Sequence, residues 1–399
     1  MKRLLILAIV LRVLVAGLLF HPDIKTYNFQ ASFMRKGVFN IYSYLVNNKS
    51  TLPLKDEFVY FPLTYFTVGI YQIVASPILG SGFNAWLANA DSNAIVMDPN
   101  IFRYLLVMKL PYLVLDIVIA FLLLHYFTDK TKAKMAFIFW LFNPFTIFLI
   151  YAYSNIDIYP VALSLIALLL AEKGRTKSAA VLLGLAAGFK LYPLLFMPFL
   201  ALTGKNLKDK IFLAAVPILI FVGISLPFLS PAFINSTLIS GLTTRILYPN
   251  LGIGFNESLI VGILTMVGLF FYSALVDKKM DMVSYWSVLF LVVLSFAHFH
   301  IAWLLWVAPF LVILVVRKPQ LAWTILALSA FAFVIPLLYE DRFMTVGLLR
   351  PYSLYFDLLP TPFAVVQKFF DPYSLQSIFH SALAGVTLVV SYIAIKKEI

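Results

Sequence analysis

Long apolar segments follow one another through almost the whole chain, and the short loops between them hold most of the basic residues. About 20 consecutive apolar residues in a helix are needed to cross a bilayer. Of the 399 residues, 62% are hydrophobic and only 12% are charged, whereas a soluble domain is about one-quarter charged. The sequence therefore predicts an all-α polytopic membrane protein and excludes an ordinary soluble enzyme. The absence of cysteine also excludes disulfides and thiolate metal sites.

The basic residues predict the topology, because Lys and Arg gather in cytoplasmic loops. If the Tyr- and Phe-rich segment 59–79 lies in the outer interface without crossing, 17 of the 30 basic residues fall in inner loops and termini. This placement accounts for the net charge of +12 without a nucleic-acid partner. Arg12, within the first apolar segment, favours a retained span over a cleaved signal peptide. We expect about twelve spans, at residues 4–20, 101–127, 135–153, 157–171, 178–190, 191–203, 211–229, 258–276, 283–298, 301–316, 321–338 and 375–395.

Charged groups near the hydrocarbon require a partner or a wet cavity, so each of them is a functional candidate. Asp23 follows the first span, where it is either a general base at a cavity mouth or a solvated carboxylate that pairs with Lys25. Lys190 lies between two short spans, as a cation for a phosphate or as a lysine that snorkels to the interface. Asp157 lies in an outer turn, where it caps the next helix or holds a sugar hydroxyl.

The remaining polar groups are more ambiguous. Lys109 and Asp116 are two helical turns apart, so both are expected to face protein, with Asp116 in a structural role. The pair His298 and His300 lacks nearby carboxylates and makes a poor metal site, and the tryptophans that follow are interpreted as an interfacial belt. Outer loops contain four further charged residues that line a cavity or are simply solvated: Arg245, Glu340, Asp341 and Arg342.

Several stretches together resemble the polyprenol-dependent glycosyltransferases of the GT-C fold. The nearest likeness is to the catalytic subunit of GPI mannosyltransferase I and to glycosyltransferase family 87. The resemblance covers residues 1–205 well and residues 206–399 thinly, within one transmembrane domain of residues 1–399. It rests on Asp23 with Tyr27, on segments 37–42, 58–63, 142–144, 155–157 and 188–193, and on a later segment, 298–309.

The resemblance implies transfer of a sugar, mannose in the main, from a polyprenyl-phosphate donor to a lipid-linked or glycolipid acceptor, with inversion at the anomeric carbon. Asp23 is then the catalytic base, and the donor phosphate is bound by Lys190 with Arg245 or Arg342. The GPI enzymes carry Asp-x-Asp where this chain has Asp23 and Lys25, so neither a metal nor another cofactor is expected. The residues expected to position substrate are Tyr27, Tyr60, Asn155, Asp157, Tyr192, His298 and His300.

Three questions stay open at this stage. A transporter or lipid flippase with an outward-facing polar cavity is the alternative from another class, although its charges should be spread along the whole crossing. Glucose, an aminosugar or an oligosaccharide are alternative transferred groups, and the acceptor is a glycolipid, a lipid-linked oligosaccharide or a protein. The membrane is the plasma membrane of a prokaryote or the endoplasmic reticulum, with the site on the outer or lumenal face.

Overall fold

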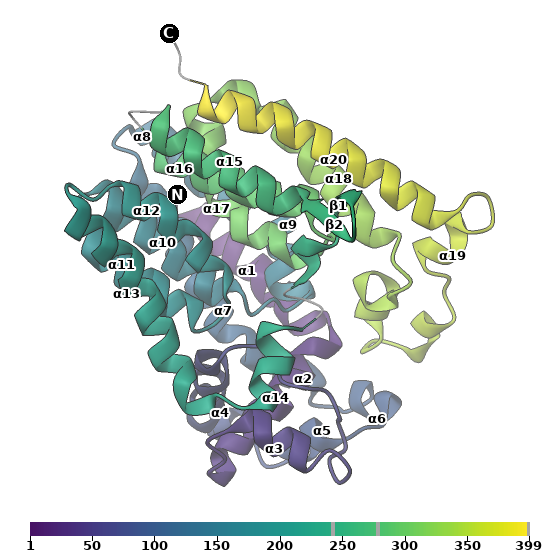
Figure 1. The fold of residues 1–399 in the computed structure, drawn as a ribbon. Helices are drawn as coiled ribbons and strands as arrows, with labels where there is room; N and C mark the ends of the chain where they lie inside the picture. The colour runs from purple at the N-terminus through teal and green to yellow at the C-terminus, as the bar shows by residue number, and fades with distance from the viewer. Residues whose placement is uncertain (241–243, 277–279, 397–399) are drawn as a thin grey trace.

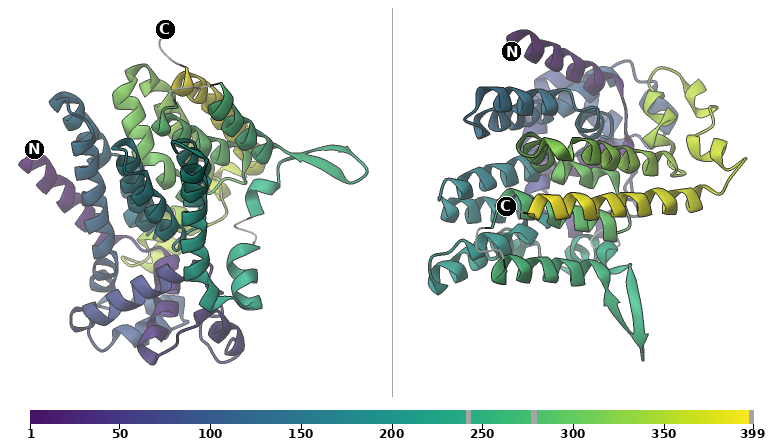
Figure 2. Two further views of the ribbon diagram at one scale, coloured as in Figure 1. Left: turned by 60° about the vertical axis from the view of Figure 1, so that its left-hand side comes forward. Right: turned by 90° about the horizontal axis from the view of Figure 1, so that it is seen from above.

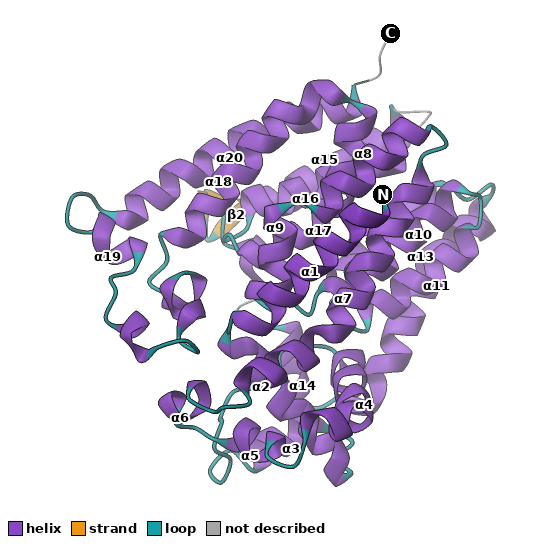
Figure 3. Ribbon diagram, turned by 180° about the vertical axis from the view of Figure 1, so that it is seen from behind, coloured by secondary structure: helices purple, strands orange, loops and turns teal. Residues whose placement is uncertain are grey.

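The computed structural model describes residues 1–240, 244–276 and 280–396, and this part of the chain is helical apart from one short hairpin (Figures 1 and 3). The helices and strands are α1 (Lys2–Leu18), α2 (Pro22–Ser32), α3 (Ile41–Asn47), α4 (Pro62–Leu79), α5 (Phe83–Ala88), α6 (Ser92–Val96), α7 (Ile101–Tyr126), α8 (Lys130–Leu141), α9 (Pro144–Ile147), α10 (Ile158–Glu172), α11 (Thr176–Ala187), α12 (Met197–Leu202), α13 (Leu207–Ser225), α14 (Pro231–Phe233), β1 (Asn250–Gly254), β2 (Glu257–Ile260), α15 (Val261–Leu275), α16 (Met282–Phe296), α17 (Leu304–Arg317), α18 (Ala322–Leu337), α19 (Pro362–Val366) and α20 (Pro372–Ile395).

The long apolar helices make the chain a multi-pass integral membrane protein. Within the described residues, five segments are long and apolar enough to cross a bilayer, and two bent helix pairs raise this number to as many as seven. Six further apolar helices are shorter, with 10–17 residues each. The all-α membrane class is thus confirmed at this level, and the finer figure of twelve spans stays a prediction.

The long helices stand side by side, whereas α2, α3, α4, α5, α6 and α14 gather in a layer at one end of the bundle (Figure 1). Both chain termini lie away from this layer (Figures 1 and 2). Helix α4 packs against α2, α7 and α13. It forms over the segment expected to be a juxtamembrane helix, and by length and composition alone it is also able to span.

Polar groups on α7 hold α1 in place. The fully buried Arg12 of α1 forms an ion pair with the fully buried Asp116, which also accepts hydrogen bonds from Trp140 and Tyr151. The Lys109 ammonium donates to the carbonyl oxygens of Ala16 and Leu19 at 3.0 and 2.7 Å, where α1 ends. The expectation that Lys109 and Asp116 face protein is confirmed, and the reason is shared: Arg12 of α1 pairs with Asp116, and the carbonyl groups at the end of α1 bind Lys109.

Three predicted spans have different boundaries in the structure. Segment 135–153 is broken at Asn143, because Pro144 cannot continue the hydrogen bonding of α8, and the two halves meet at 42°. Segment 191–203 begins with a 3-10 turn before the short α12. Segment 258–276 begins as strand β2 and becomes helical only at Val261. The hairpin that contains β2 was not expected from the sequence.

Candidate functional site

The junction between α1 and α2 fixes the position of Asp23. The chain bends by 78° between these helices, and His21 caps α2 by accepting the backbone N–H of Asp23 at Nδ1, at 3.3 Å. Pro22 occupies the first turn, where its missing N–H costs nothing. Asp23 therefore lies in the first turn of a helix, where the helix dipole favours a negative charge, and not in a free loop.

The Asp23 carboxylate is surrounded by protein atoms but is partly open to solvent. Its side chain is 48% exposed, yet burial by surrounding atoms raises its pKa from 3.8 to about 6. A hydrogen bond from Tyr153 and the charge of Lys190 lower the pKa, whereas the charge of Asp56 raises it. A carboxylate with a pKa near 6 is mostly ionised at neutral pH and able to accept a proton.

Tyr153 connects Asp23 with two histidines. The Tyr153 ring lies 4.3 Å from the His21 ring, centroid to centroid, and its hydroxyl is 3.4 Å from Nε2 of His300. Burial, as the largest cause, lowers the pKa of His21 to about 4 and that of His300 to about 3. Both imidazoles are therefore neutral at physiological pH and serve as hydrogen-bonding groups instead of cations.

Lys190 and Asp157 form an ion pair close to Asp23. The ammonium nitrogen of Lys190 is 4.0 Å from a carboxylate oxygen of Asp157 and 4.9 Å from the centre of the Tyr60 ring. Burial, followed by the charges of Asp23 and Asp157, raises the pKa of Tyr60 and that of Tyr153. Asp23 and Asp157 thus act on the same two hydroxyls. We call Asp23, Asp157 and Lys190, together with the neutral Tyr153 and His300, the charged cluster.

Backbone contacts bring Lys190 to the start of α4. Helix α11 ends at Ala187, and the carbonyl oxygen of Gly188 accepts the N–H of Leu63 at 3.0 Å. The next carbonyl, of Phe189, accepts the N–H of Phe61 at 3.4 Å. Free carbonyl groups at a helix end and free N–H groups at a helix start satisfy one another in this way. The arrangement holds the turn that carries Lys190 against the segment that carries Tyr60.

Asp157 does not cap its helix as expected. It occupies the N-cap position of α10, but its side chain makes no capping hydrogen bond and instead accepts one from the Trp306 indole at 2.8 Å. Trp306 is only 6% exposed and its ring stacks on Tyr192 at 4.1 Å. The interpretation of this tryptophan as part of an interfacial belt is therefore wrong, because the side chain is buried and its N–H group donates to a carboxylate inside the protein.

The turn before Asp157 is held from two sides. Ser154 has a positive φ of 63°, which is uncommon for a residue with a side chain. The Tyr27 hydroxyl donates to the Ser154 carbonyl at 3.2 Å. Asn155 accepts the N–H of Asp157 at 2.9 Å and donates to the carbonyl of Ala302 at 3.1 Å. Tyr27 and Asn155 therefore support the turn, and a π-helical turn over Phe148–Ala152, of a kind frequent at functional sites, precedes it.

Two of the predicted cations have different surroundings. Arg245, on the 3-10 turn Thr244–Leu247, lies near His298 and His300, because its charge, after burial, lowers the pKa of both. Arg342 forms an ion pair with Asp357 at 3.4 Å and also donates to the Leu359 carbonyl. Arg245 thus lies beside the charged cluster, whereas Arg342 is bound within its own loop.

The position that would complete an Asp-x-Asp pair is taken by Lys25. Its ammonium donates to the carbonyl oxygens of Leu87 and Asn89, at 2.7 and 2.8 Å, and so it does not pair with Asp23 as one reading expected. Within the described residues, no three His, Asp or Glu side chains are grouped as a metal ion requires. These residues do not fit a metal held by an Asp-x-Asp pair.

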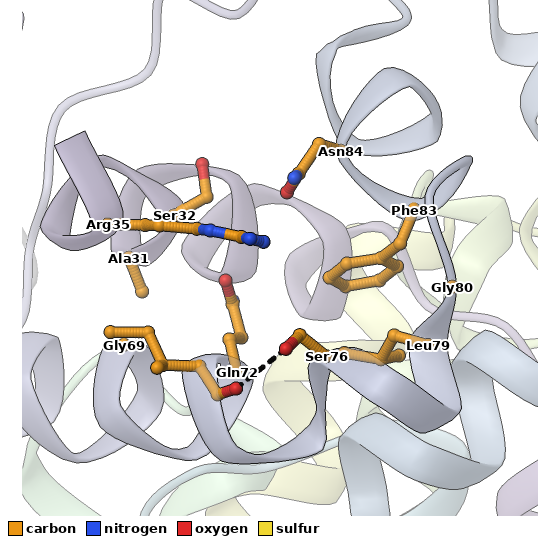
Figure 4. Close-up of a pocket in the computed structure, with 11 residues that line it drawn as sticks. Ala31, Ser32, Arg35, Gly69, Gln72, Ser76, Leu79, Gly80, Phe83 and Asn84 are labelled. Atoms are coloured by element: carbon orange, nitrogen blue, oxygen red, sulfur yellow. Dashed lines mark hydrogen bonds between the residues drawn. The ribbon is translucent and has the colours of Figure 1, made fainter.

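A small recess lies between the end of α2 and α4 (Figure 4). The Arg35 guanidinium extends across it toward Asn84, with Gln72 and Ser76 on the opposite wall. The space has room for little more than a water molecule, so it is too small for a sugar. None of the charged cluster lines it, and we assign it no substrate.

The long apolar helices place the chain among the multi-pass integral membrane proteins, and within it Asp23, Asp157 and Lys190 come close together. The model of glycosyltransferase family 87 matches residues 99–336, which is more than half of the chain. The chain therefore belongs to glycosyltransferase family 87 and is a membrane glycosyltransferase. No curated protein gives a significant match. The matched range includes Asp157, Lys190 and Arg245, whereas Asp23 precedes it and Arg342 follows it.

Three residues that contact the site were not expected there from the sequence: His21, Tyr153 and Trp306. The pattern His21-Pro22 before a polar helical segment is a signal for a helix start. No local pattern marks Tyr153 or Trp306 as site residues, because their partners Asp23 and Asp157 meet them only through tertiary packing.

Proposed function

We propose that the protein transfers a sugar, mannose in the first instance, from a polyprenyl-phosphate donor to a glycolipid or lipid-linked acceptor on the outer or lumenal face of its membrane. The proposed architecture is the GT-C fold, with the layer of α2–α6 outside the bilayer and α4 as its juxtamembrane helix. The observation that carries the proposal is the half-exposed Asp23 carboxylate with a pKa near 6, close enough to Lys190 for the ammonium to lower that pKa.

In the proposed reaction, Asp23 is the general base. The acceptor hydroxyl oxygen attacks C1 of the sugar while its proton passes to the Asp23 carboxylate. A new C1–O bond forms on one face of the ring as the bond to the donor phosphate breaks on the other, which inverts the anomeric centre. General-base assistance of this kind contributes about 10²–10⁴-fold to the rate.

Lys190 is the proposed partner of the leaving phosphate. The bond electrons depart with the lipid phosphate, whose negative charge increases, and a fixed cation stabilises that charge in the transition state. The ion pair with Asp157 and the contact with the Tyr60 ring support a fixed ammonium, since both restrain its position. Arg245 is the second candidate cation, because it lies beside His300. Arg342 is the weakest of the three, because its contacts, Asp357 and the Leu359 carbonyl, lie within its own loop.

The test is product analysis with the purified protein in lipid nanodiscs. Polyprenyl-phosphate mannose is supplied with a panel of glycolipid, lipid-linked oligosaccharide and peptide acceptors, and the product masses are recorded. We expect one acceptor to gain one hexose, with the new linkage opposite in configuration to that of the donor. Transfer only from nucleotide sugars, or retention of configuration, would contradict the proposal. Parallel reactions with polyprenyl-phosphate glucose test the choice of sugar separately.

A further inference from the structure

The hairpin of β1 and β2 is an amphipathic ribbon with no protein packed on its apolar face. Leu251 pairs with Leu259 across the ribbon on one face, and Ile253, which lies at the bulge between Gly252 and Gly254, adds a third exposed apolar side chain. The opposite face carries the pair Gly252 and Ser258. Leu251 is 59% exposed and Ile253 60% exposed. One face is therefore apolar and uncovered, and the other is small and polar.

The tip of the ribbon is more apolar still. Phe255 and Asn256 both have positive φ, at 49° and 64°, so the chain reverses in the tight form that suits a two-residue hairpin. This turn directs the Phe255 side chain entirely outward, and Phe255 is the most exposed large apolar side chain of the described chain. Two views show the ribbon extending away from the body of the protein (Figure 2).

The uncovered surface continues onto a membrane helix. Strand β2 runs directly into α15, an apolar helix. Ile263, Leu264, Val267 and Phe271 of α15 are all exposed, as expected for side chains that face lipid. A two-stranded ribbon alone is marginally stable in water, and so large an apolar surface is rarely left bare on a folded protein. In a membrane protein the contiguous lipid surface is the available cover.

We propose that the ribbon over residues 250–260 lies in the membrane interface, with Leu251, Ile253 and Leu259 against lipid and Phe255 as the deepest residue. Its single charged residue, Glu257, is close to the turn, and the remaining polar groups are small. The ribbon would act as an anchor for the preceding segment. The turn over Thr244–Leu247, which carries Arg245, packs against α15 through Ile246 and Gly262. The lipid anchor and the cation beside the charged cluster are thus mechanically connected.

The cysteine-free chain allows a direct test by site-specific fluorescence. Single cysteines are introduced by Phe255→Cys, Ile253→Cys and, on the opposite face as the matched control, Ser258→Cys. Each is labelled with an environment-sensitive dye in phosphatidylcholine nanodiscs, and quenching by nitroxide lipids is compared with quenching by aqueous iodide. Because all three positions are exposed, the labels are not expected to disturb folding, which gel filtration checks.

The proposal predicts blue-shifted emission at 255 and 253, with most of the fluorescence lost to nitroxide lipids and little to iodide, and the reverse at 258. Water-like emission with iodide quenching at all three positions would overturn it. Protection from both quenchers at 255 and 253, with cross-linking between copies of the chain, would also overturn it, because a second protein would then cover the ribbon. None of these outcomes depends on glycosyl transfer, so the proposed function stands or falls separately.

Discussion

At the scale of single residues, the pKa of Asp23 connects structure with reactivity. Burial, which raises the pKa, outweighs the Tyr153 hydrogen bond and the Lys190 charge, which lower it. The carboxylate is consequently protonated more easily than an exposed aspartate but is still ionised at neutral pH. The pKa of such a base is closer to the pH at which the enzyme operates than the pKa of an unperturbed carboxylate is.

The pH dependence of transfer should report this balance. We expect kcat/KM of the wild-type enzyme to rise with pH through about 6 and then level off, because only the ionised carboxylate accepts a proton. Tyr153→Phe removes a hydrogen bond to the ionised form, and its acid limb should therefore move to higher pH. Initial rates between pH 4.5 and 8.5 measure both curves. An unmoved acid limb in Tyr153→Phe would show that the titrating group is not Asp23.

Lys190 is tested by removing its charge. Lys190→Ala and Lys190→Gln should lower kcat by about 10²-fold, since a fixed charge aimed at the leaving group is lost. Lys190→Arg should retain part of the rate, and Lys208→Ala, an exposed lysine on α13, should change nothing. Turnover and donor affinity are measured with polyprenyl-phosphate mannose. Wild-type turnover and wild-type donor affinity in both neutral variants would contradict this role and would mean that Lys190 only snorkels to the interface.

At the scale of elements, the attachment of α1 to α7 depends on buried charges. Removing one partner of a buried ion pair leaves the other charge uncompensated, and this typically costs about 3–5 kcal/mol. Lys109 adds a second link, because its ammonium binds the last carbonyl groups of α1. The two contacts fix the direction in which α1 leaves the bundle, and with it the bend that presents Asp23.

Arg12→Met should therefore lower the unfolding temperature sharply, and its free-energy cost should fall within that range of about 3–5 kcal/mol. Val114→Ala is the control, because Val114 is 63% exposed on α7, the helix that carries Asp116, and its substitution should cost under about 0.5 kcal/mol. Thermal unfolding in one detergent compares the two. Equal stability of the two variants would mean that the Arg12–Asp116 pair contributes little.

The sequence predicted elements well where the signal is local. The spacing of Lys109 and Asp116 predicted a shared protein-facing side, and the structure confirms it. The ribbon was missed because its run of Leu251, Ile253 and Phe255, which alternates with small residues, is brief and lies beside the apolar segment of α15. The partner of Arg12 was out of reach as well, because Asp116 meets it only once α1 and α7 pack.

At the scale of the whole molecule, the charged cluster lies at one end of the bundle, so the topology decides which side of the membrane it faces. The charged cluster draws residues from the start of α2, from the turns before α10 and after α11, and from the turn before α17. These turns come together at the layer end of the bundle. The sequence predicted this convergence from the basic loops, and only the packed structure shows which hydroxyl and indole groups join it.

Labelling of a single cysteine tests the topology. Ser81→Cys lies just after α4 and is exposed, so it should react with a membrane-impermeant thiol reagent applied from the outer side. We expect this result because, in the proposed topology, α4 does not cross the bilayer and Ser81 stays on the outer side. A cysteine replacing Lys130, at the start of α8, should react only from the inner side. Reaction of Ser81→Cys from the inner side alone would invert the topology and the placement of the site.

The most direct test of the central claim is turnover by Asp23→Asn. Asparagine preserves shape and hydrogen bonding but is not a base, so turnover should fall by about 10²-fold or more while the lipid donor still binds. Because folding raises the pKa of Asp23, the ionised carboxylate costs stability above pH 6, and Asp23→Asn should unfold no earlier than wild type at pH 7.5. A stable, donor-binding and inactive variant is the result predicted. Full activity of Asp23→Asn with a competent acceptor would contradict the mechanism.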